Sequence, residues 1–309
     1  MSEFRGYMMI VGAALFWGVS ATAAKHLQNL GVDTLLIVQT RVSFSAIFLL
    51  AFFALFRRET LRVKPGDLWR FALVGVIGVA GANYTYYTVI EKSTVATGIL
   101  IQYTAPLFVM AYAIAVKEEG FGLVKLGAAV ISLGGCFLAV GGYDQNVVKI
   151  TPSVLINGAG SVFCFAFLTV YTRHLLRRYS LWTTSFYAIF FAACFWLVLN
   201  PPWKIAAGSL SPALWVSLAV LAVFSVLIPH SLFFGGLRVV VPSRAIITST
   251  LEPVAAIVSA ALLLAEHLKP LQVTGAGMVI LAIVLLNFRP ERDRAVQPAF
   301  SIPERDDAS

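Results

Sequence analysis

Charged residues are scarce in this chain of 309 residues: Asp, Glu, Lys and Arg together make up 12% of it, and hydrophobic residues make up 59%. A soluble domain usually has about 25% charged residues. The composition therefore excludes a water-soluble globular enzyme. A bilayer core needs about 20 apolar residues for each helical crossing, so the chain has room for about ten crossings with short connections and no soluble domain.

Residues and motifs for enzyme chemistry are also rare. The chain has three cysteines, all inside apolar runs: Cys136, Cys164 and Cys194. We interpret them as small buried hydrophobic residues, because no CxxC or Cys/His pair has metal-ligand spacing. The four histidines lie at different predicted helix ends: His26, His174, His230 and His267. With no GxSxG or HExxH motif either, we predict no enzyme activity, no metal and no cofactor.

The formal net charge of +8 raises the possibility of a nucleic-acid partner. However, the basic residues lie in short connections between apolar runs, where Lys and Arg normally set the orientation of a membrane protein. We therefore predict the lipid bilayer as a partner and no nucleic acid.

The apolar runs predict an all-α membrane protein with ten transmembrane helices. Their approximate ranges are 6–25, 34–56, 70–90, 94–116, 122–142, 153–173, 181–200, 213–237, 243–264 and 270–288. The runs are continuous, whereas the strands of a membrane barrel would give alternating segments of about ten residues. The polar, proline-containing tail at 290–309 predicts a disordered cytoplasmic segment.

The distribution of Lys and Arg predicts the orientation. With ten spans, seventeen basic residues fall on the side of the two termini, five fall on the other side, and Arg41 lies within a span. The more basic side of a membrane protein is usually cytoplasmic. We therefore predict a multi-pass protein of the inner membrane with both termini in the cytoplasm.

An internal repeat divides the chain. A shift of 147 residues aligns Asn83 with His230, Tyr86-Tyr87 with Phe233-Phe234, Pro106 with Pro253, and Glu119 with Glu266. We predict two five-helix halves, residues 1–143 and 150–289. Because five is odd, the halves enter the membrane from opposite sides, an arrangement typical of secondary transporters.

These residues resemble the drug/metabolite transporter superfamily, in its EamA-type branch of ten helices. The resemblance spans residues 7–288 and depends on the segment Gly12-Ala13-Ala14-Leu15-Phe16-Trp17-Gly18, on Arg41, on Pro106, Glu119 and Gly127, and on Glu252-Pro253, Glu266 and Gly275. It implies a central cavity walled by helices one to four and six to nine, with helices five and ten at the periphery. It also implies a small-metabolite substrate, often an amino acid, with export as the commoner direction.

Two ionisable residues are predicted near the bilayer midplane. Arg41 lies about eight residues into the second helix and Glu252 about nine residues into the ninth, which corresponds to depths of roughly 12–14 Å from opposite faces. One interpretation is a fixed ion pair between the halves. The other is that Glu252 takes up and releases a proton while Arg41 holds an anionic group. Either would justify the cost of placing these groups inside a membrane.

Aromatic and amide side chains are the candidates for the cavity wall. The predicted substrate-binding residues are Trp17, Asn83, Tyr86, Tyr87, Gln102, Tyr103, Phe163, His230, Phe233 and Phe234. Rings can hold a flat or cationic solute, and the polar groups can fix its polar end. The alternatives are ordinary packing or interfacial anchoring for the rings, and a packing or proton-carrying role for His230.

Prolines and glycines add further expectations. Pro253 and Pro106 each remove a helical hydrogen bond and can expose a carbonyl to the cavity. Gly75, Gly78 and Gly81 predict a close helix-packing face and not a phosphate loop, because no strand precedes them.

The glutamates at the ends of helices four and nine, Glu119 and Glu266, are interpreted as end anchors or as gate elements.

The function predicted from these observations is a secondary transporter that exports a small metabolite, an amino acid or related organic solute, across the inner membrane by alternating access. Protons are a candidate coupling ion. The alternative is a ligand-binding sensor or scaffold without transport, although the chain has no room for a soluble output domain. A passive channel is a further alternative, but Arg41 and Glu252 do not form the charged rings that are typical of one.

Overall fold

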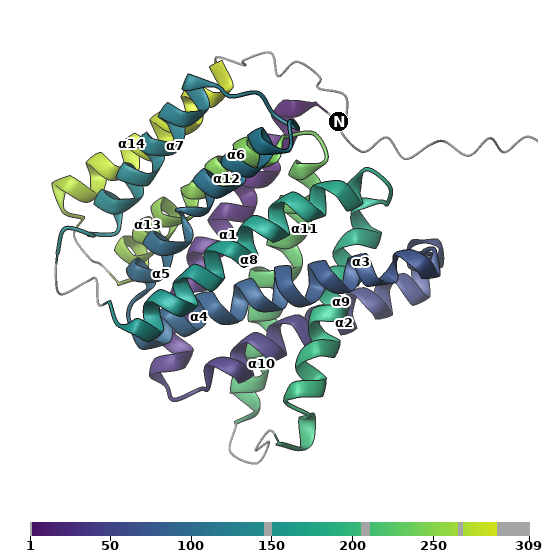
Figure 1. Ribbon diagram of the computed structural model, residues 1–309. Helices are drawn as coiled ribbons and strands as arrows, with labels where there is room; N and C mark the ends of the chain where they lie inside the picture. Colours follow the sequence, from purple (N-terminus) through teal and green to yellow (C-terminus); the bar gives the residue numbers. More distant parts are fainter. Residues whose placement is uncertain (1, 145–149, 205–210, 265–267, 289–309) are drawn as a thin grey trace, which may run out of the picture.

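The computed structural model describes residues 2–144, 150–204, 211–264 and 268–288, and over these ranges the chain is helical without strands (Figure 1). The prediction of an all-α protein is confirmed. The predicted disordered tail, 290–309, lies outside the described residues, as do Glu266 and His267.

Six spans are single helices: α1 (Glu3–Asn29), α2 (Thr34–Phe56), α7 (Leu123–Ala139), α8 (Pro152–Leu176), α9 (Leu181–Leu199) and α14 (Pro270–Phe288). Four spans are interrupted: α3 (Leu68–Leu73), η3 (Val74–Gly81) and α4 (Ala82–Lys92); α5 (Val95–Gln102) and α6 (Ala105–Ala115); α10 (Pro212–Ala222), η6 (Val223–Leu227) and α11 (Ile228–Leu237); α12 (Pro242–Thr248), η7 (Ser249–Leu251) and α13 (Glu252–Leu264). Short 3₁₀ helices lie in the connections: η1 (Arg58–Leu61), η2 (Pro65–Asp67) and η4 (Pro202–Lys204).

Helix starts follow from local sequence. Five helices begin after a Ser or Thr whose hydroxyl accepts the backbone N–H three residues on: Ser2, Thr94, Thr151, Ser180 and Ser211. These hydroxyls satisfy N–H groups that have no partner in the first helical turn. Seven of the helical segments are long and apolar enough to cross a membrane, and α7 and α14 are shorter apolar helices.

The two halves pack against each other in the same way: the first helix of each half contacts helices of the other half. In the first half α1 packs against α11 and α13, and in the second half α8 packs against α4, α5 and α6. Two further pairs join corresponding helices, α2 with α9 and α7 with α14. Figure 1 shows α7 and α14 side by side at one edge of the bundle. This is the packing that a two-fold relation between the halves would produce.

The helix interruptions also recur under the 147-residue shift. The π-helical segments η3 and η6 occupy overlapping positions in the two halves. The break between α5 and α6 aligns with η7, which precedes α13. Each break comes just before a proline, Pro106 or Pro253. Interrupted helices near the middle of a bundle are typical of binding sites in transporters.

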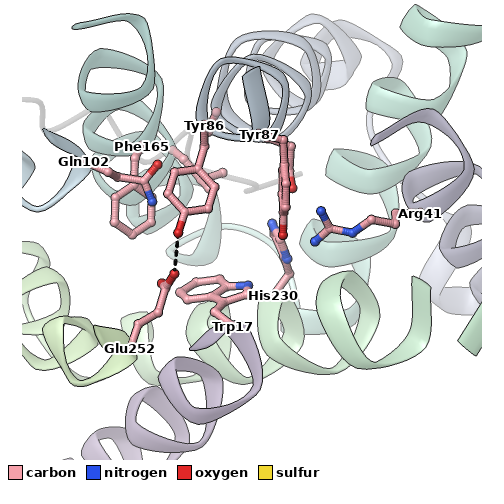
Figure 2. A pocket seen from close by; sticks show the side chains of 11 residues that line it. Trp17, Arg41, Tyr86, Tyr87, Gln102, Phe165, His230 and Glu252 are labelled. Carbon is pink, nitrogen blue, oxygen red and sulfur yellow. Dashed lines mark hydrogen bonds between the residues drawn. The ribbon is translucent and has the colours of Figure 1, made fainter. Parts of the chain in front are cut away.

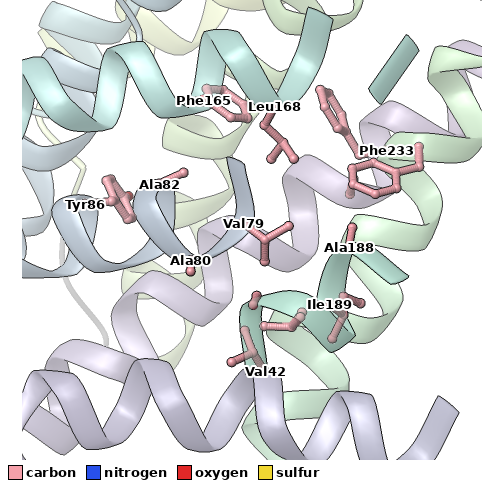
Figure 3. Packing of buried hydrophobic residues seen from close by; sticks show 14 of the residues in the cluster. Val42, Val79, Ala80, Ala82, Tyr86, Phe165, Leu168, Ala188, Ile189 and Phe233 are labelled. Atoms are coloured by element: carbon pink, nitrogen blue, oxygen red, sulfur yellow. The ribbon is translucent and has the colours of Figure 1, made fainter. Parts of the chain in front are cut away.

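The core forms where η3 meets α8 and α9 (Figure 3). A side chain at Gly75 would collide with the backbone of α9 at Ala188, and one at Gly78 or Gly81 would collide with α8. The three glycines therefore form the predicted close-packing face, which serves two neighbouring helices. The cysteines are free, Cys136 buried and the other two half-buried.

Candidate functional site

A pocket of about 50 Å³ lies in the middle of the bundle (Figure 2). It is lined by Trp17, Arg41, Ala82, Asn83, Tyr86, Tyr87, Gln102, Phe165, Leu168, His230 and Glu252. These residues come from α1, α2, α4, α5, α8, α11 and α13. Helices α7 and α14 contribute none of them, as the resemblance implied for the fifth and tenth spans.

Glu252 stands at the first position of α13, and two phenols hold its carboxylate. Tyr86 donates to Oε1 at 3.0 Å and Tyr103 donates to Oε2 at 2.7 Å. The Tyr103 hydroxyl also lies 2.8 Å from the carbonyl oxygen of Ser249. Pro253 has no N–H for that carbonyl, which is four residues before it, and the Tyr103 hydroxyl takes the place of the missing donor. Ser249 is buried and does not line the pocket. The two hydrogen bonds orient the carboxylate without neutralising its charge.

The backbone around Glu252 is packed closely. Gly18 of α1 leaves no room for a side chain, because a β-carbon there would lie 2.5 Å from the carbonyl oxygen of Glu252 and 2.7 Å from the β-carbon of Ala255. The small residue therefore lets α1 touch the start of α13. This contact fixes Trp17, the residue before Gly18, in the same pocket as the carboxylate.

Arg41 of α2 is 1% exposed, and its guanidinium is bound by the interrupted span α10–η6–α11. Its Nε donates to Ser225 Oγ at 2.6 Å and its Nη2 to the Ser225 carbonyl oxygen at 3.2 Å. Pro229, four residues after Ser225, cannot donate to that carbonyl, so it remains available to the guanidinium. The Tyr87 ring centroid lies 4.5 Å from Arg41 Cζ, which is a cation–π distance.

Two buried polar groups in the pocket have no hydrogen-bond partner among the described residues: Arg41 Nη1, a donor, and Gln102 Oε1, an acceptor. Leaving such groups unsatisfied costs about 1–3 kcal/mol each. The pocket is therefore prepared to accept a polar molecule.

The fixed ion pair, one of the two interpretations of Arg41 and Glu252, is not formed between these described residues. Within the described residues no salt bridge joins them, and each is bound by neutral groups instead. Figure 2 shows the two side chains at opposite ends of the pocket, with Tyr87, Trp17 and His230 between them in the view.

His230 and Asn83 lie on the pocket wall and bond to their own helices. His230 Nδ1 lies 3.0 Å from the Val226 carbonyl, so that nitrogen carries the proton and Nε2 is an acceptor. Asn83 Nδ2 donates to the Val79 carbonyl at 2.7 Å. Both side chains keep one acceptor that is not used by these bonds.

Apart from Phe163, the aromatic candidates divide into two groups. Trp17, Tyr86 and Tyr87 line the pocket, whereas Tyr103, Phe233 and Phe234 are buried behind it. The Trp17 ring lies 5.3 Å from that of Phe233, and the His230 ring 6.0 Å from that of Phe234. These two phenylalanines support wall residues and do not line the pocket.

Phe163 lies outside the pocket, with 62% of its surface exposed. Phe165, which was not predicted, lies in the pocket with its ring 6.1 Å from that of Trp17. The sequence contained a signal: one residue added to the 147-residue shift aligns Trp17 with Phe165. Leu168 and Ala82 were also not predicted.

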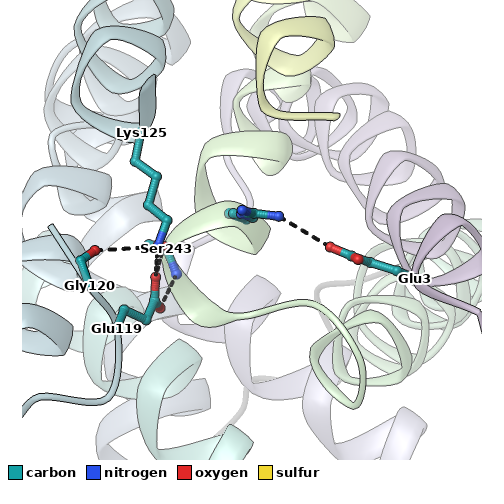
Figure 4. A network of polar contacts seen from close by, with 6 residues as sticks. Glu3, Glu119, Gly120, Lys125 and Ser243 are labelled. Carbon is teal, nitrogen blue, oxygen red and sulfur yellow. Dashed lines mark hydrogen bonds and ion pairs between the residues drawn. The ribbon is translucent and has the colours of Figure 1, made fainter. Parts of the chain in front are cut away.

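A second buried polar cluster lies away from the pocket (Figure 4). Lys125 Nζ is 3.2 Å from Glu119 Oε2. The other carboxylate oxygen of Glu119 accepts the backbone N–H of Ser243 at 3.2 Å, and the Ser243 hydroxyl also donates to this carboxylate. Glu119 therefore joins the start of α7 to the start of α12, which agrees with its interpretation as an end anchor.

Comparison with known proteins agrees with these features. A model of the EamA-like transporter family matches residues 4–141 and 152–288. An uncharacterized inner membrane transporter, YicL of Salmonella typhimurium, is 22% identical over 94% of this chain and 98% of its own. The threonine/homoserine exporter RhtA of Escherichia coli K12 is 28% identical over 78% of each chain.

A solved crystal structure has the same fold, with a TM-score of 0.75 at 14% identity, over 93% of this chain and 98% of its own. The family match covers most of the sequence, in the segment before residue 142 and again after residue 151. The chain belongs to the EamA-like transporter family, within the drug/metabolite transporter superfamily that its sequence resembles.

Proposed function

We propose that the protein is a secondary transporter that exports a small zwitterionic metabolite, such as an amino acid, across the inner membrane by alternating access. The observation that carries this proposal is that Arg41 and Glu252 line one pocket without pairing with each other.

Charge balance favours a zwitterion. A buried charge is costly when no opposite charge compensates it. A solute with a carboxylate and an ammonium group can compensate both pocket charges at once, whereas an anion or a cation alone leaves one of them unmatched. The carboxylate would accept from Arg41 Nη1, and the ammonium would donate to Glu252 and to Gln102 Oε1. The Trp17 face is available to the ammonium as a cation–π partner.

Size supports alternating access. The pocket of about 50 Å³ is smaller than ligand sites of about 300–1,000 Å³, so the surrounding helices must separate to admit a solute. The breaks at Tyr103 and at Ser249–Leu251 allow half-helices to move next to the two charges. In this proposal the halves 1–143 and 150–289 exchange conformations, with both termini in the cytoplasm.

The direction and the solute class draw support from one relative. RhtA is named a threonine/homoserine exporter and is 28% identical to this chain. Threonine and homoserine are zwitterions, as the pocket charges require. These two amino acids are therefore the first solutes to test.

The test is counterflow in proteoliposomes. Vesicles are loaded with unlabelled threonine or homoserine, and uptake of the labelled amino acid is measured. Competitors are the decarboxylated amine, the deaminated acid, a sugar and a nucleoside. We expect each single-charge analogue to compete at least about 30-fold more weakly than the amino acid, because losing one buried charged contact costs about 2–5 kcal/mol. A pH gradient that changes the net flux would identify protons as the coupling ion.

Variants connect this result to the pocket. Arg41→Gln and Glu252→Gln should abolish amino-acid exchange, whereas Phe48→Leu, on the same helix as Arg41 but 40% exposed, should leave it unchanged. Exchange of an uncharged solute, or wild-type amino-acid exchange in both pocket variants, would contradict the proposal. Binding of the amino acid without exchange would favour the sensor or scaffold.

A further inference from the structure

A large groove lies on the other side of α8 from the central pocket. Its volume is about 1080 Å³, and it is formed by residues of α3, α6 and α8 with the segments that follow α6 and α8. Phe165 and Leu168 of α8 line the pocket, whereas Phe163 and Phe167 line the groove. The groove and the pocket share no lining residue.

The wall of the groove is apolar and open. Phe163 is 62% exposed and Phe108, from α6, is 60% exposed. On α8 a row of rings follows the helix: Phe163 stacks on Phe167 at 6.3 Å, and Phe167 stacks on Tyr171 at 5.1 Å. The rings lie on α6 and α8, which belong to helical segments long and apolar enough to span a membrane. The row provides a continuous surface for an acyl chain.

The row of rings ends at a basic rim. His174 follows Tyr171 with its ring 6.3 Å away, and Arg70, Arg177 and Arg178 also line the groove. The side chains of these three arginines are 29%, 45% and 39% exposed.

Two carboxylates are shared among these cations. Asp67 lies 3.2 Å from Arg70 and 3.9 Å from Arg178. Glu118 lies 3.6 Å from Arg177 and 3.0 Å from His174. Three arginines therefore face two carboxylates, and the rim keeps a positive charge even when His174 is neutral.

We propose that this groove binds an anionic phospholipid, with an acyl chain along the ring row of α8 and the phosphate at Arg70, Arg177 and Arg178. Basic pockets beside membrane spans are suited to lipid phosphates. The surplus positive charge disfavours a cationic amphiphile, and a small zwitterion has no apolar part that could use the exposed rings. The proposal depends on the membrane fold and not on the proposed transport.

The test is native mass spectrometry of the full-length protein in detergent. Phosphatidylglycerol, phosphatidylcholine with the same acyl chains, and inorganic phosphate are added separately. We expect phosphatidylglycerol to remain bound in preference to phosphatidylcholine, and phosphate alone to give no adduct. Equal retention of the two lipids, or no retention of either, would overturn the proposal, as would a dimer that excludes lipid.

Variants locate the site. The triple variant Arg70→Gln, Arg177→Gln and Arg178→Gln should retain phosphatidylglycerol no better than phosphatidylcholine, because each arginine contributes about fivefold to anionic-lipid binding. A matched triple variant replaces three exposed arginines outside the groove: Arg57→Gln, Arg58→Gln and Arg62→Gln. It should behave as the wild type.

The single variant Arg177→Gln, at the most exposed of the three groove arginines, keeps the test decisive if the groove triple variant does not fold. It should weaken phosphatidylglycerol binding about fivefold while phosphatidylcholine binding is unchanged. Undiminished phosphatidylglycerol binding in either groove variant would refute the site. Since the readout is bound lipid, a failure here leaves the counterflow result unaffected.

Discussion

Two clusters of buried charge in this protein satisfy their charges in opposite ways. In the cluster of Figure 4, Glu119 and Lys125 pair directly at 3.2 Å, and Ser243 completes the coordination of the carboxylate. In the central pocket, Arg41 and Glu252 are held separately by neutral groups. A charge paired within the protein completes a joint between helices, whereas separately held charges leave an opening for a charged solute.

Breaking the paired cluster should have the largest effect on stability. Glu119→Ala leaves the Lys125 ammonium, which is 1% exposed, without its carboxylate. Removing one partner of a buried ion pair costs about 3–5 kcal/mol. We expect the free energy of unfolding to fall by about this amount, measured by denaturant unfolding in detergent micelles. The double variant Glu119→Leu with Lys125→Met should recover most of the lost free energy of unfolding.

The same measurement on the pocket gives the contrast. Arg41→Met should lower the free energy of unfolding by less than Glu119→Ala does, because removing a buried charge that has no ion-pair partner offsets the loss of its hydrogen bonds to Ser225. If Glu119→Ala instead left stability unchanged and altered exchange, Glu119 would be a gate element, and the contrast between the two clusters would fail.

The contact between α1 and α13 should give the next largest effect. Gly18→Ala places a methyl group 2.5 Å from the Glu252 carbonyl oxygen. Because the nearest atom belongs to the backbone, relief requires α13 to shift, which should cost about 1–3 kcal/mol and weaken amino-acid exchange. Gly12→Ala is the matched control on the same helix, since its methyl would meet only the end of the Leu232 side chain at 3.3 Å. Equal effects of the two variants would show that the contact at Glu252 has no special importance.

Span positions could be predicted from sequence because the thickness of the bilayer sets the length of each apolar run. The ranges 34–56 and 270–288 agree with α2 and α14, and the other predicted spans differ from the helices by a few residues. The π-helical segment η3 could not be predicted, because its apolar residues are compatible with an ordinary α-helix. The positions of Arg41 and Glu252 within their spans predicted that both lie near the midplane, and the structure places both in one pocket.

The contacts of the site were harder to predict. The helix α8 is apolar on all sides, so hydrophobicity alone did not distinguish Phe163 from Phe165. Arg41 and Glu252 are bound by Ser225 and Tyr103, and neither residue type signals such a role in sequence. Prolines did carry information. Pro253 predicted that a carbonyl lacks its helical N–H donor, which is the Ser249 carbonyl, and the same reasoning at Pro229 would have found the Ser225 carbonyl.

Removing either phenol hydroxyl that binds Glu252 also tests the comparison between the two clusters, with a smaller expected effect on the free energy of unfolding. The Tyr103 hydroxyl lies within hydrogen-bond distance of two acceptors, the Glu252 carboxylate and the Ser249 carbonyl. Tyr86 donates to the Glu252 carboxylate alone. Tyr86→Phe should lower the free energy of unfolding by about 0.5–1.5 kcal/mol, and Tyr103→Phe by about 1–3 kcal/mol, because the latter leaves a second acceptor without its donor. Tyr84→Phe, on the same helix as Tyr86 and 37% exposed, is the control for unfolding in detergent.

Both phenol variants should also weaken exchange of the zwitterion, since a carboxylate that is no longer oriented cannot be positioned for the ammonium group. Stability losses in the reverse order, with exchange unchanged in both variants, would mean that the phenols pack against Glu252 without positioning it. The carboxylate would then be held by the backbone contact at Gly18 alone, and the central pocket would resemble the Glu119 cluster in being a joint between helices.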